Sequence, residues 1–405
     1  MMKQLARAMA AALVALGVAA PGAMAQQPQD LVVQSTTSVR DSGVLDRLIT
    51  PQFEKRFPQW NLKFVAVGTG QAIANARAGQ GDVLIGHSPA LEAQFLADGF
   101  SFEPIGRTVM WNDFVIVGPK SDPAGILTRS PHDAAREFEL IAAAGAAGRA
   151  NFVSRGDNSG TNTKERDIWG LSRIAHDAQN NPAGRPAWYH TAGLGMADTL
   201  RLTQQCPFAG GGCYTITDRG TLQQLTNNRA ISLKTIMDDQ SGHARGGVNL
   251  MLNVYNVYAI NPRKFPAVKL QGALAFMDFL TSKPFQDALA TFPSRRRPGF
   301  FPAASPRVQL TRRPPRTVHA GDVVTVSGTI ASAVPGAAPL AGLPVRLARL
   351  ATAVNPLVLA RGRVDARGRF TLRARVRRGG PLVLTTPRFR NLSPLSRAIG
   401  SVAVR

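Results

Sequence analysis

The alternation of two hydrophobic periods constrains the fold of this chain more than any other feature of its sequence. From Leu31 to Asp98, short runs of β-branched and aliphatic residues alternate with stretches in which apolar residues recur at helical spacing. Strands that alternate with helices favour an α/β domain with a mainly parallel sheet. The predicted strands are Leu31–Val33, Leu62–Val67 and Val83–Ile85, and the predicted helices are Val44–Phe57, Gln71–Ala78 and Pro89–Asp98.

The pattern changes after residue 304. Between 305 and 405 the apolar segments are short and are separated by Gly, Pro and Asn. In Phe370–Val376, apolar residues alternate with Thr and Arg, a period of two that buries one face of a strand and leaves the other face basic. This texture predicts a small β-sandwich over 305–405. Its other predicted strands are Val323–Val326, Val345–Leu350, Leu357–Val364, Leu382–Thr385 and Ile399–Val404.

The positive charge is unevenly distributed along the chain. The net charge of +23 would by itself suggest a polyanionic partner. Residues 305–405 carry 18 Arg, no Lys and two Asp, which makes +16, whereas residues 1–304 carry 30 basic and 23 acidic residues, which makes +7. The excess is mostly a property of the last quarter of the chain, so the net charge does not describe one partner.

The N-terminus has the three parts of a secretory signal peptide. Lys3 and Arg7 form a basic start, Ala10–Ala20 is an apolar run of 11 residues, and Ala23-Met24-Ala25 is a cleavage site of the A-x-A type. The apolar run is shorter than the roughly 20 residues of a transmembrane helix. We therefore expect residues 1–25 to be removed, and the mature chain to be a soluble periplasmic protein without a nucleic-acid partner.

Cys206 and Cys213 are the two cysteines of the chain. In an exported protein they are expected to form a disulfide that closes a short loop. Their spacing is not C-x-x-C, and the six His are scattered without an H-E-x-x-H motif. The sequence therefore predicts no redox centre, no metal site on protein ligands and no cofactor.

Three loops rich in hydroxyl groups and glycine stand where a predicted strand gives way to a helix. They contain Ser35-Thr36-Thr37-Ser38, Gly68-Thr69-Gly70, and the segment Ser154–Thr161 with Arg155. A helix N-terminus offers unpaired N–H groups, glycine permits close approach, and Arg can bind two oxygens at once. Each loop alone is also consistent with ordinary helix capping. The three together favour a cleft for a tetrahedral oxyanion.

Motifs of common enzymes are missing from the same loops. Gly68-Thr69-Gly70 lacks the third glycine of a dinucleotide fingerprint, because Ile73 stands in its place. The chain has no phosphate-binding loop of the G-x-x-x-x-G-K type and no G-x-S-x-G elbow. Asp157 and Ser159 have no His at a catalytic spacing. We therefore expect a binding protein and not an enzyme.

Residues 31–304 resemble the periplasmic tungstate-binding proteins of ABC importers. The resemblance implies an α/β, bilobal type II periplasmic-binding-protein fold with a hinge, which holds an oxyanion between its lobes and delivers it to a membrane permease. It places crossovers near Phe114–Val117 and Val254–Ile260, so that lobe one comprises 26–113 and 256–304, and lobe two 114–255. The matching stretches are Ser35–Gly43, Ala66–Ala72, Asn112–Pro119, Ser154–Thr161, Trp188–Met196 and Tyr214–Thr221.

The resemblance and the loop chemistry together give a hypothesis for the ligand-binding residues. Ser35, His87 and Asp157 are further candidates: His87 is also consistent with a loop cap, and Asp157 with a role in orienting Arg155. The principal residues are Thr36, Thr37, Ser38, Thr69 and Gly70 from lobe one, and Arg155, Ser159, Gly160 and Thr161 from lobe two.

Phosphate is the main alternative to tungstate or molybdate, because phosphate-binding proteins carry a similar Arg-x-Asp-x-Ser-Gly-Thr loop. Monohydrogen phosphate keeps a proton and needs a carboxylate acceptor, whereas tungstate and molybdate need donors only. Where a phosphate binder places an Asp after the strand Val83–Ile85, this chain has Gly86-His87-Ser88. The pattern favours an unprotonated oxyanion and leaves tungstate, molybdate and sulfate open.

Residues 305–405 are similar to the Ig-like or transthyretin-like modules of secreted bacterial proteins, on the stretches Ala320–Gly328 and Asp365–Phe370. Two interpretations of the Arg-rich module stay open: retention on an anionic envelope surface, or a solvated strand face with a bias toward Arg. A second class of function also stays open, in which the chain serves envelope attachment and its binding domain has lost its ligand.

Overall fold

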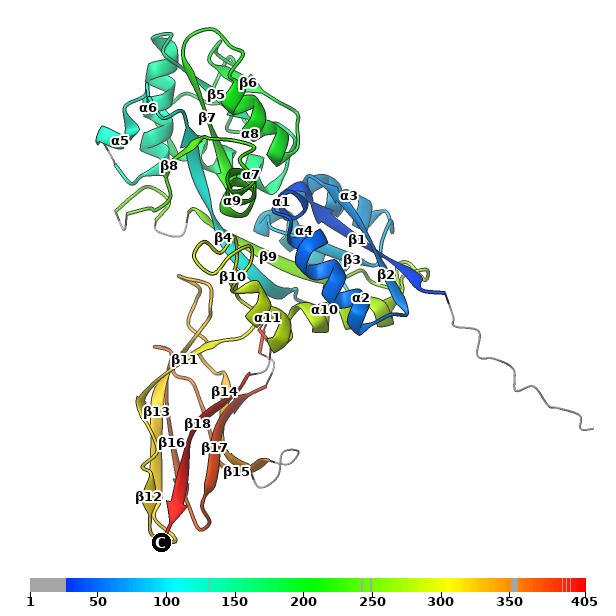
Figure 1. Cartoon of the computed structure of the whole chain (residues 1–405), viewed down its shortest axis with the longest axis vertical. Helices are drawn as coiled ribbons and strands as arrows, with labels where there is room; N and C mark the ends of the chain where they lie inside the picture. The colour runs from blue at the N-terminus through cyan, green and yellow to red at the C-terminus, as the bar shows by residue number, and fades with distance from the viewer. Residues whose placement is uncertain are drawn as a thin grey trace, which may run out of the picture.

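The computed structural model describes residues 27–129, 131–241, 243–247, 250–350, 356–387, 389–390, 392–393 and 395–405. The signal peptide expected over 1–25 lies outside these ranges. Within them, no helix combines the length and the hydropathy that a membrane span requires. Two α/β lobes lie beside each other, and an elongated β module extends away from them (Figure 1).

The first lobe is built on three parallel strands. The central strand β1 (Gln29–Thr36) pairs with β2 (Trp60–Val67) and β3 (Val83–Gly86). The predicted helices are present with shifted ends, since the capping residues and not the apolar periodicity alone fix where a helix starts. They are a π-helical turn η1 (Leu45–Ile49) that leads into α2 (Thr50–Arg56), α3 (Thr69–Arg77) and α4 (Pro89–Ala97). A short helix that was not predicted, α1 (Thr37–Asp41), precedes them.

Two long strands connect the lobes. Strand β4 (Arg107–Gly118) pairs with β9 (Leu252–Ala259) and with β7 (Gly212–Asp218), and β9 also pairs with β3; all three pairings are antiparallel. The sheet is therefore mixed and not mainly parallel, because β4 and β9 run between the lobes in opposite directions. Both predicted crossovers fall on these strands, while the exact lobe boundaries stay a prediction.

The second lobe repeats the arrangement of parallel strands with helices. Strand β5 (Ala150–Ser154) lies between β6 (Tyr189–Thr191) and β7, and both pairings are parallel. The short strand β8 (Lys234–Met237) adds to β4. The helices are α5 (Ile126–Arg129), α6 (Ala134–Ala146), α7 (Gly160–Leu171), α8 (Met196–Gln205) and α9 (Arg219–Asn227).

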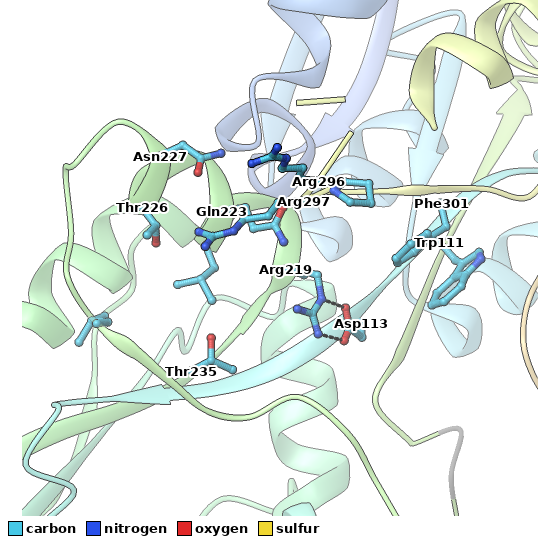
Figure 2. A pocket seen from close by; sticks show the side chains of 13 residues that line it. Trp111, Asp113, Arg219, Gln223, Thr226, Asn227, Thr235, Arg296, Arg297 and Phe301 are labelled. Atoms are coloured by element: carbon cyan, nitrogen blue, oxygen red, sulfur yellow. Dashed lines mark hydrogen bonds and ion pairs between the residues drawn. The ribbon is translucent and has the colours of Figure 1, made fainter. Parts of the chain in front are cut away.

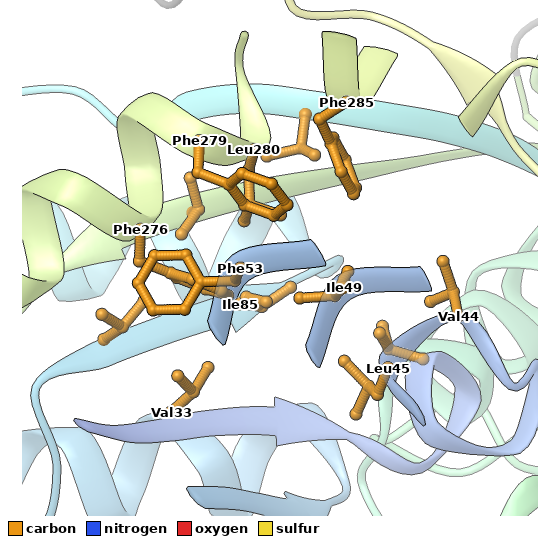
Figure 3. Close-up of a cluster of buried hydrophobic side chains, with 14 of the residues drawn as sticks. Val33, Val44, Leu45, Ile49, Phe53, Ile85, Phe276, Phe279, Leu280 and Phe285 are labelled. Atoms are coloured by element: carbon orange, nitrogen blue, oxygen red, sulfur yellow. The ribbon is translucent and has the colours of Figure 1, made fainter. Parts of the chain in front are cut away.

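Each lobe has its own apolar core. In the first, Phe53 of α2 packs edge-on against Phe276 of α10 (Leu270–Leu280), with ring centroids 5.1 Å apart, and α11 (Lys283–Leu289) adds Phe285 (Figure 3). The segment after β9 therefore returns to the first lobe. In the second, the rings of Phe138 and Trp169 pack at a tilt, with centroids 4.5 Å apart. Separate cores allow the two lobes to move as units about β4 and β9.

The C-terminal module consists of two sheets around a third core. Strand β10 (Phe301–Pro302) still pairs with β4, and the module begins at β11. One sheet has the order β11-β13-β16, and the other β12-β18-β17-β14-β15. The strands are β11 (Arg307–Arg312), β12 (Thr317–Val318), β13 (Val323–Ala331), β14 (Pro344–Leu350), β15 (Pro356–Arg363), β16 (Arg369–Arg375), β17 (Gly380–Thr386) and β18 (Leu395–Val404). β11 and β12 were not predicted, because they are short and rich in polar residues.

Candidate functional site

The first loop joins β1 to α1 without any intervening residues. The hydroxyl of Thr36 caps the helix by accepting the Val39 N–H at 3.4 Å. This cap starts a short helix, α1, that the apolar pattern did not predict, and the predicted helix from Val44 follows it as η1 and α2. Ser35 and Thr36 are consequently the last residues of the strand, and Thr37 and Ser38 lie in the first helical turn; all four side chains are buried.

The second and third loops also end at helix N-termini. Gly68 is the N-cap of α3, so that Thr69 is the first helical residue. Ser159 caps α7 by accepting the Asn162 N–H at 3.2 Å. In the third loop Gly156 has a φ of +64°, and a Cβ there would lie 2.0 Å from the Thr191 side chain, so this position requires glycine.

Hydrogen bonds between the lobes bring the three loops together. The Nη2 group of Arg155 donates to Thr37 Oγ1 at 3.0 Å, and the Gly160 N–H donates to Thr69 Oγ1 at 3.3 Å. The Gly70 N–H also donates to the backbone oxygen of Asn158 at 3.3 Å. The loops predicted from separate stretches of sequence therefore form one cluster, with the lobes in contact around it.

Arg155 is the one basic side chain among the predicted residues, and it is 1% exposed. Its Nη2 group forms an ion pair with Asp157 Oδ2, and Asp157 Oδ1 accepts the Ser159 N–H at 3.1 Å. Both carboxylate oxygens are thus engaged by the protein. This arrangement fits a carboxylate that orients Arg155 better than one that accepts a proton from a ligand.

His87 lies at the end of β3 and is 3% exposed. Its ring stacks on Tyr255 with centroids 4.8 Å apart and packs against Gly160, where a Cβ would lie 2.6 Å from Cε1. His87 Nδ1 lies 2.8 Å from Asn253 Oδ1. Burial lowers the pKa of His87 to about 4; the Asn253 contact opposes this shift, and the charge of Arg155 adds to it.

A chain of amides fixes which nitrogen of His87 carries the proton. The backbone oxygen of Gly299 can only accept, so Asn112 presents its NH₂ group to it, at 3.1 Å. Asn112 Oδ1 then accepts from Asn253 Nδ2 at 2.8 Å, which leaves Asn253 Oδ1 as the acceptor for His87. Nδ1 is therefore protonated, and Nε2 of the neutral ring is a hydrogen-bond acceptor. No sequence signal had given Asn253 a role, and Asn112 had appeared only within a matching stretch.

Five of the ten buried polar side-chain atoms that make no hydrogen bond in the described part of the chain belong to predicted site residues. Burial raises the pKa of Asp218, and the nearby Ser38 hydroxyl opposes this rise. The Ser38 hydroxyl and the Asp218 carboxyl do not, however, have the geometry of a hydrogen bond. Buried polar atoms without partners are rare in folded proteins. Their concentration marks a place suited to a polar ligand. The atoms are Ser35 Oγ, Ser38 Oγ, His87 Nε2, Arg155 Nε and Thr161 Oγ1.

Further contacts between the lobes were not predicted. The Thr221 hydroxyl donates to the backbone oxygen of Ser38 at 3.3 Å, and the Ala197 N–H donates to Asp41 Oδ2 at 3.0 Å. Both come from helix starts of the second lobe, α9 and α8. Part of the signal was present, since Thr221 and Asp41 lie in stretches that match the family and Ala197 directly follows one.

A separate cavity of about 550 Å³ contains none of the predicted residues (Figure 2). In it, Trp111 stacks on Phe301 at 4.4 Å, and Arg219 forms ion pairs with Asp113 and Asp238. The part-buried guanidinium of Arg219 is already paired with two carboxylates, and the other arginines of the lining, Arg296 and Arg297, are exposed to solvent, so this cavity is less suited to holding an oxyanion than the loop cluster.

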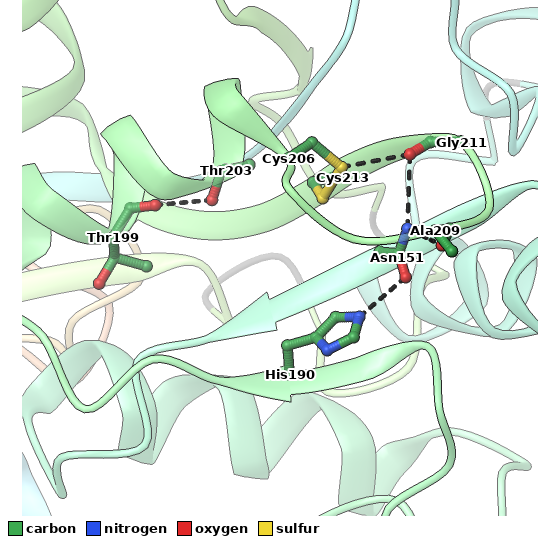
Figure 4. Close-up of a disulfide and its surroundings, with 8 residues drawn as sticks. All are labelled: Asn151, His190, Thr199, Thr203, Cys206, Ala209, Gly211 and Cys213. Carbon is green, nitrogen blue, oxygen red and sulfur yellow. Dashed lines mark hydrogen bonds between the residues drawn. A yellow bond between two sulfur atoms is a disulfide. The ribbon is translucent and has the colours of Figure 1, made fainter.

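The disulfide joins Cys206, just after α8, to Cys213 in β7 (Figure 4). Asn151 donates to the backbone oxygen of Ala209 within the enclosed loop at 3.1 Å, and His190 stacks on Phe208 at 3.6 Å. The loop is therefore fixed locally on the second lobe. Among the described residues, no group of three His, Cys, Asp or Glu side chains is placed to hold a metal ion.

Comparison with known proteins places this geometry in a family. The family model of the PBP superfamily domain matches residues 22–284. The tungstate-binding protein TupA of Peptoclostridium acidaminophilum is 33% identical over 267 residues, which cover 66% of this chain and 82% of that protein. The chain belongs to the tungstate-binding protein family of ABC transporters.

Solved structures of this family agree with the assignment. The tungstate ABC transporter structure from Geobacter sulfurreducens is 36% identical, with a TM-score of 0.53, covering 65% of this chain and 99% of that one. TupA from Desulfovibrio alaskensis G20 is 32% identical, with a TM-score of 0.52, covering 68% and 98%. As a member of this family the chain is an extracytoplasmic anion-binding protein and not an enzyme. The family match ends at residue 284, before the β module.

Proposed function

We propose that this protein captures tungstate, or the closely similar molybdate, between its two lobes and delivers it to the permease of an ABC transporter. The observation that carries the proposal is the convergence of unpartnered buried polar atoms from both lobes on one cluster of loops. The similarity to proteins named for tungstate binding supports the choice of ligand.

The donors in the cluster suit a dianion. Arg155 supplies a buried positive charge with an unpartnered Nε, and Ser35 and Thr161 supply free hydroxyl groups. The N-terminal turns of α3 and α7 add backbone N–H groups and partial positive charge. Asp157 is the one carboxylate in contact with Arg155, and its two oxygens are occupied. Asp157 therefore leaves no free oxygen for the proton of monohydrogen phosphate, and Nε2 of His87 is the unpartnered acceptor that such a ligand would find in the cluster.

Binding and closure are coupled in this proposal. Residues of both lobes would contact one anion: Thr36, Thr37, Ser38, Thr69 and Gly70 from the first, and Arg155, Ser159, Gly160 and Thr161 from the second. An anion that contacts both lobes binds the closed form, in which the lobes touch, more tightly than an open form. Its binding therefore shifts the population toward the closed form. The permease would then recognise the closed form. The lobe limits, 26–113 with 256–304 and 114–255, form part of the proposal.

Calorimetric titration tests the assignment directly. Protein refolded free of anion is titrated with tungstate, molybdate, sulfate and phosphate. We expect tungstate and molybdate to bind most tightly, and Arg155→Ala to weaken both by at least about 100-fold, since a buried charged hydrogen-bond partner contributes about 1.5–3 kcal/mol per bond. Arg173→Ala is the matched control, because Arg173 is exposed in the same lobe. Tighter binding of phosphate or sulfate would refute the proposed ligand, and unchanged affinity in Arg155→Ala would refute the site.

A further inference from the structure

One end of the C-terminal module carries basic side chains from two segments, the end of β16 with the turn after it and the residue before β12. The turn between β12 and β13 lies beside the end of β16, since Gly321 N donates to Val376 O at 2.8 Å and Val376 N donates to Asp322 O at 2.9 Å. β12 pairs with the end of β18, and Val402 of β18 pairs with Gly380 at the start of β17. This end of the module is the one farthest from the lobes (Figure 1).

Four exposed arginines make up this surface, which we call the basic tip: Arg316, Arg375, Arg377 and Arg378. None of them forms an ion pair with another described residue. Asp322 is the acidic side chain at this end, and it is already used: it accepts the His319 N–H at 2.8 Å and its carboxylate lies 3.7 Å from the His319 ring. The tip therefore presents uncompensated positive charge to solvent.

The chemistry of the tip points to phosphate groups on an extended surface. Guanidinium groups bind phosphate oxygens in pairs, which ammonium groups cannot do with the same geometry. Arg375 ends β16, Arg377 and Arg378 follow it in one turn, and Arg316 lies directly before β12, so the basic groups belong to two segments that an array of headgroups could engage together. Val323 pairs with Arg375 in the sheet, and its side chain, 55% exposed, is the large apolar group that the tip presents to solvent. A single valine offers little apolar surface for insertion between lipids. Attachment would therefore be electrostatic and shallow.

We propose that the basic tip docks the protein reversibly on a surface of anionic phospholipid headgroups. The export signal predicted at residues 1–25 directs the chain away from nucleic acid and toward the envelope. Docking through the tip leaves the two lobes at the other end of the module, away from the docked surface (Figure 1). The inference does not depend on the identity of the bound anion.

Sedimentation with vesicles tests the docking surface on the full chain. Vesicles of phosphatidylglycerol in phosphatidylcholine are compared with pure phosphatidylcholine, at roughly 0.05 M and 0.5 M salt, which span strong and weak screening. We expect binding to the anionic vesicles at low salt only. Each basic residue near such a surface raises the partition coefficient of the protein onto the vesicles by about fivefold. We therefore expect this coefficient to fall by at least about 100-fold in the triple variant Arg316→Glu/Arg377→Glu/Arg378→Glu.

A matched variant separates the tip from net charge. Lys55→Glu/Lys120→Glu/Arg173→Glu makes the same change in charge on exposed side chains of the lobes. Unchanged vesicle binding in this control, beside loss in the tip variant, supports the proposal. Equal loss in both variants would overturn it in favour of a general charge effect. Failure of the unmodified chain to sediment, or sedimentation only with lipopolysaccharide, would overturn the phospholipid assignment. Oxyanion affinity, measured on the same samples, reports separately on the proposed function.

Discussion

Replacement of His87 by Gln removes a proton-binding group whose pKa burial lowers from 6.5 to about 4 in the anion-free protein. Each pKa unit corresponds to about 1.36 kcal/mol, so the structure disfavours the charged ring by about 3 kcal/mol. Because the folded chain holds this proton more weakly than the unfolded chain, the contribution of His87 to stability is constant above a pH of about 6.5 and falls as the pH drops to about 4. At neutral pH we expect a neutral ring with Nε2 as an acceptor.

A bound dianion reverses this preference. A unit charge about 4 Å from another contributes about 4 kcal/mol at an effective dielectric constant of about 20, so a dianion next to Nε2 outweighs the penalty of about 3 kcal/mol. The pKa of His87 would then rise above neutrality, and Nε2–H would become a donor to the anion. Binding is therefore expected to take up about one proton, and affinity should rise up to about tenfold for each pH unit that the solution is lowered toward the pKa of the free site.

Two measurements check the prediction with molybdate as the probe. The Cε1 resonances of the six His are titrated with and without molybdate, and His87 is assigned by the resonance missing from His87→Gln. Calorimetry in buffers of different ionisation enthalpy then counts the protons taken up on binding, which should be about one in the unmodified protein and about zero in His87→Gln. Equal proton counts in the two proteins, or a His87 resonance that titrates near its ordinary value without anion, would refute the reasoning.

Three further predictions concern the loops and the disulfide. Arg155→Lys keeps the charge but loses the planar fork, so calorimetry should show molybdate affinity reduced by roughly 10- to 100-fold, less than in Arg155→Ala; equal losses would contradict a role for the fork. Gly160→Ala places a Cβ 2.6 Å from His87 Cε1, a clash that should destabilise the contact between the lobes by about 1–3 kcal/mol. Because molybdate is proposed to bind that contact, the rise in melting temperature that molybdate produces should be smaller in this variant. Cys206→Ser/Cys213→Ser opens a loop of seven-residue separation and should lower its local stability by about 2.5 kcal/mol in hydrogen exchange, with oxyanion affinity unchanged.

Much of the site could be predicted because its chemistry is local. Ser159 in front of α7 and Gly156 in the left-handed region are properties of a few neighbouring residues, and they are visible in the sequence as capping and turn signals. The short helix α1 was not predicted, because the apolar run from Val44 dominates the periodicity and the cap at Thr36 starts a separate helix before it. Local signals compete, and the sequence alone did not rank them.

The other part of the site depends on contacts between distant residues. Arg155 reaches Thr37 across 118 positions, and the tautomer of His87 is set by Asn253, 166 positions away. Such contacts depend on the register of β4 and β9, which aligns Asn112 with Asn253 and holds the lobes together. No sequence pattern specifies this register without the sheet.

The sequence by itself indicated the family, the three donor-rich loops and the Arg-rich character of the last quarter, and it predicts an export signal over residues 1–25, because each follows from residue type and short-range order. The tertiary structure decided which of these groups face one another. In the folded chain both oxygens of Asp157 form contacts with Arg155 and Ser159, and Nε2 of His87 is an acceptor. The side chains of Arg316, Arg377 and Arg378 lie at one end of the module. The physical reason is that hydrogen bonding and charge act over a few ångströms, and only the folded chain fixes distances at that scale.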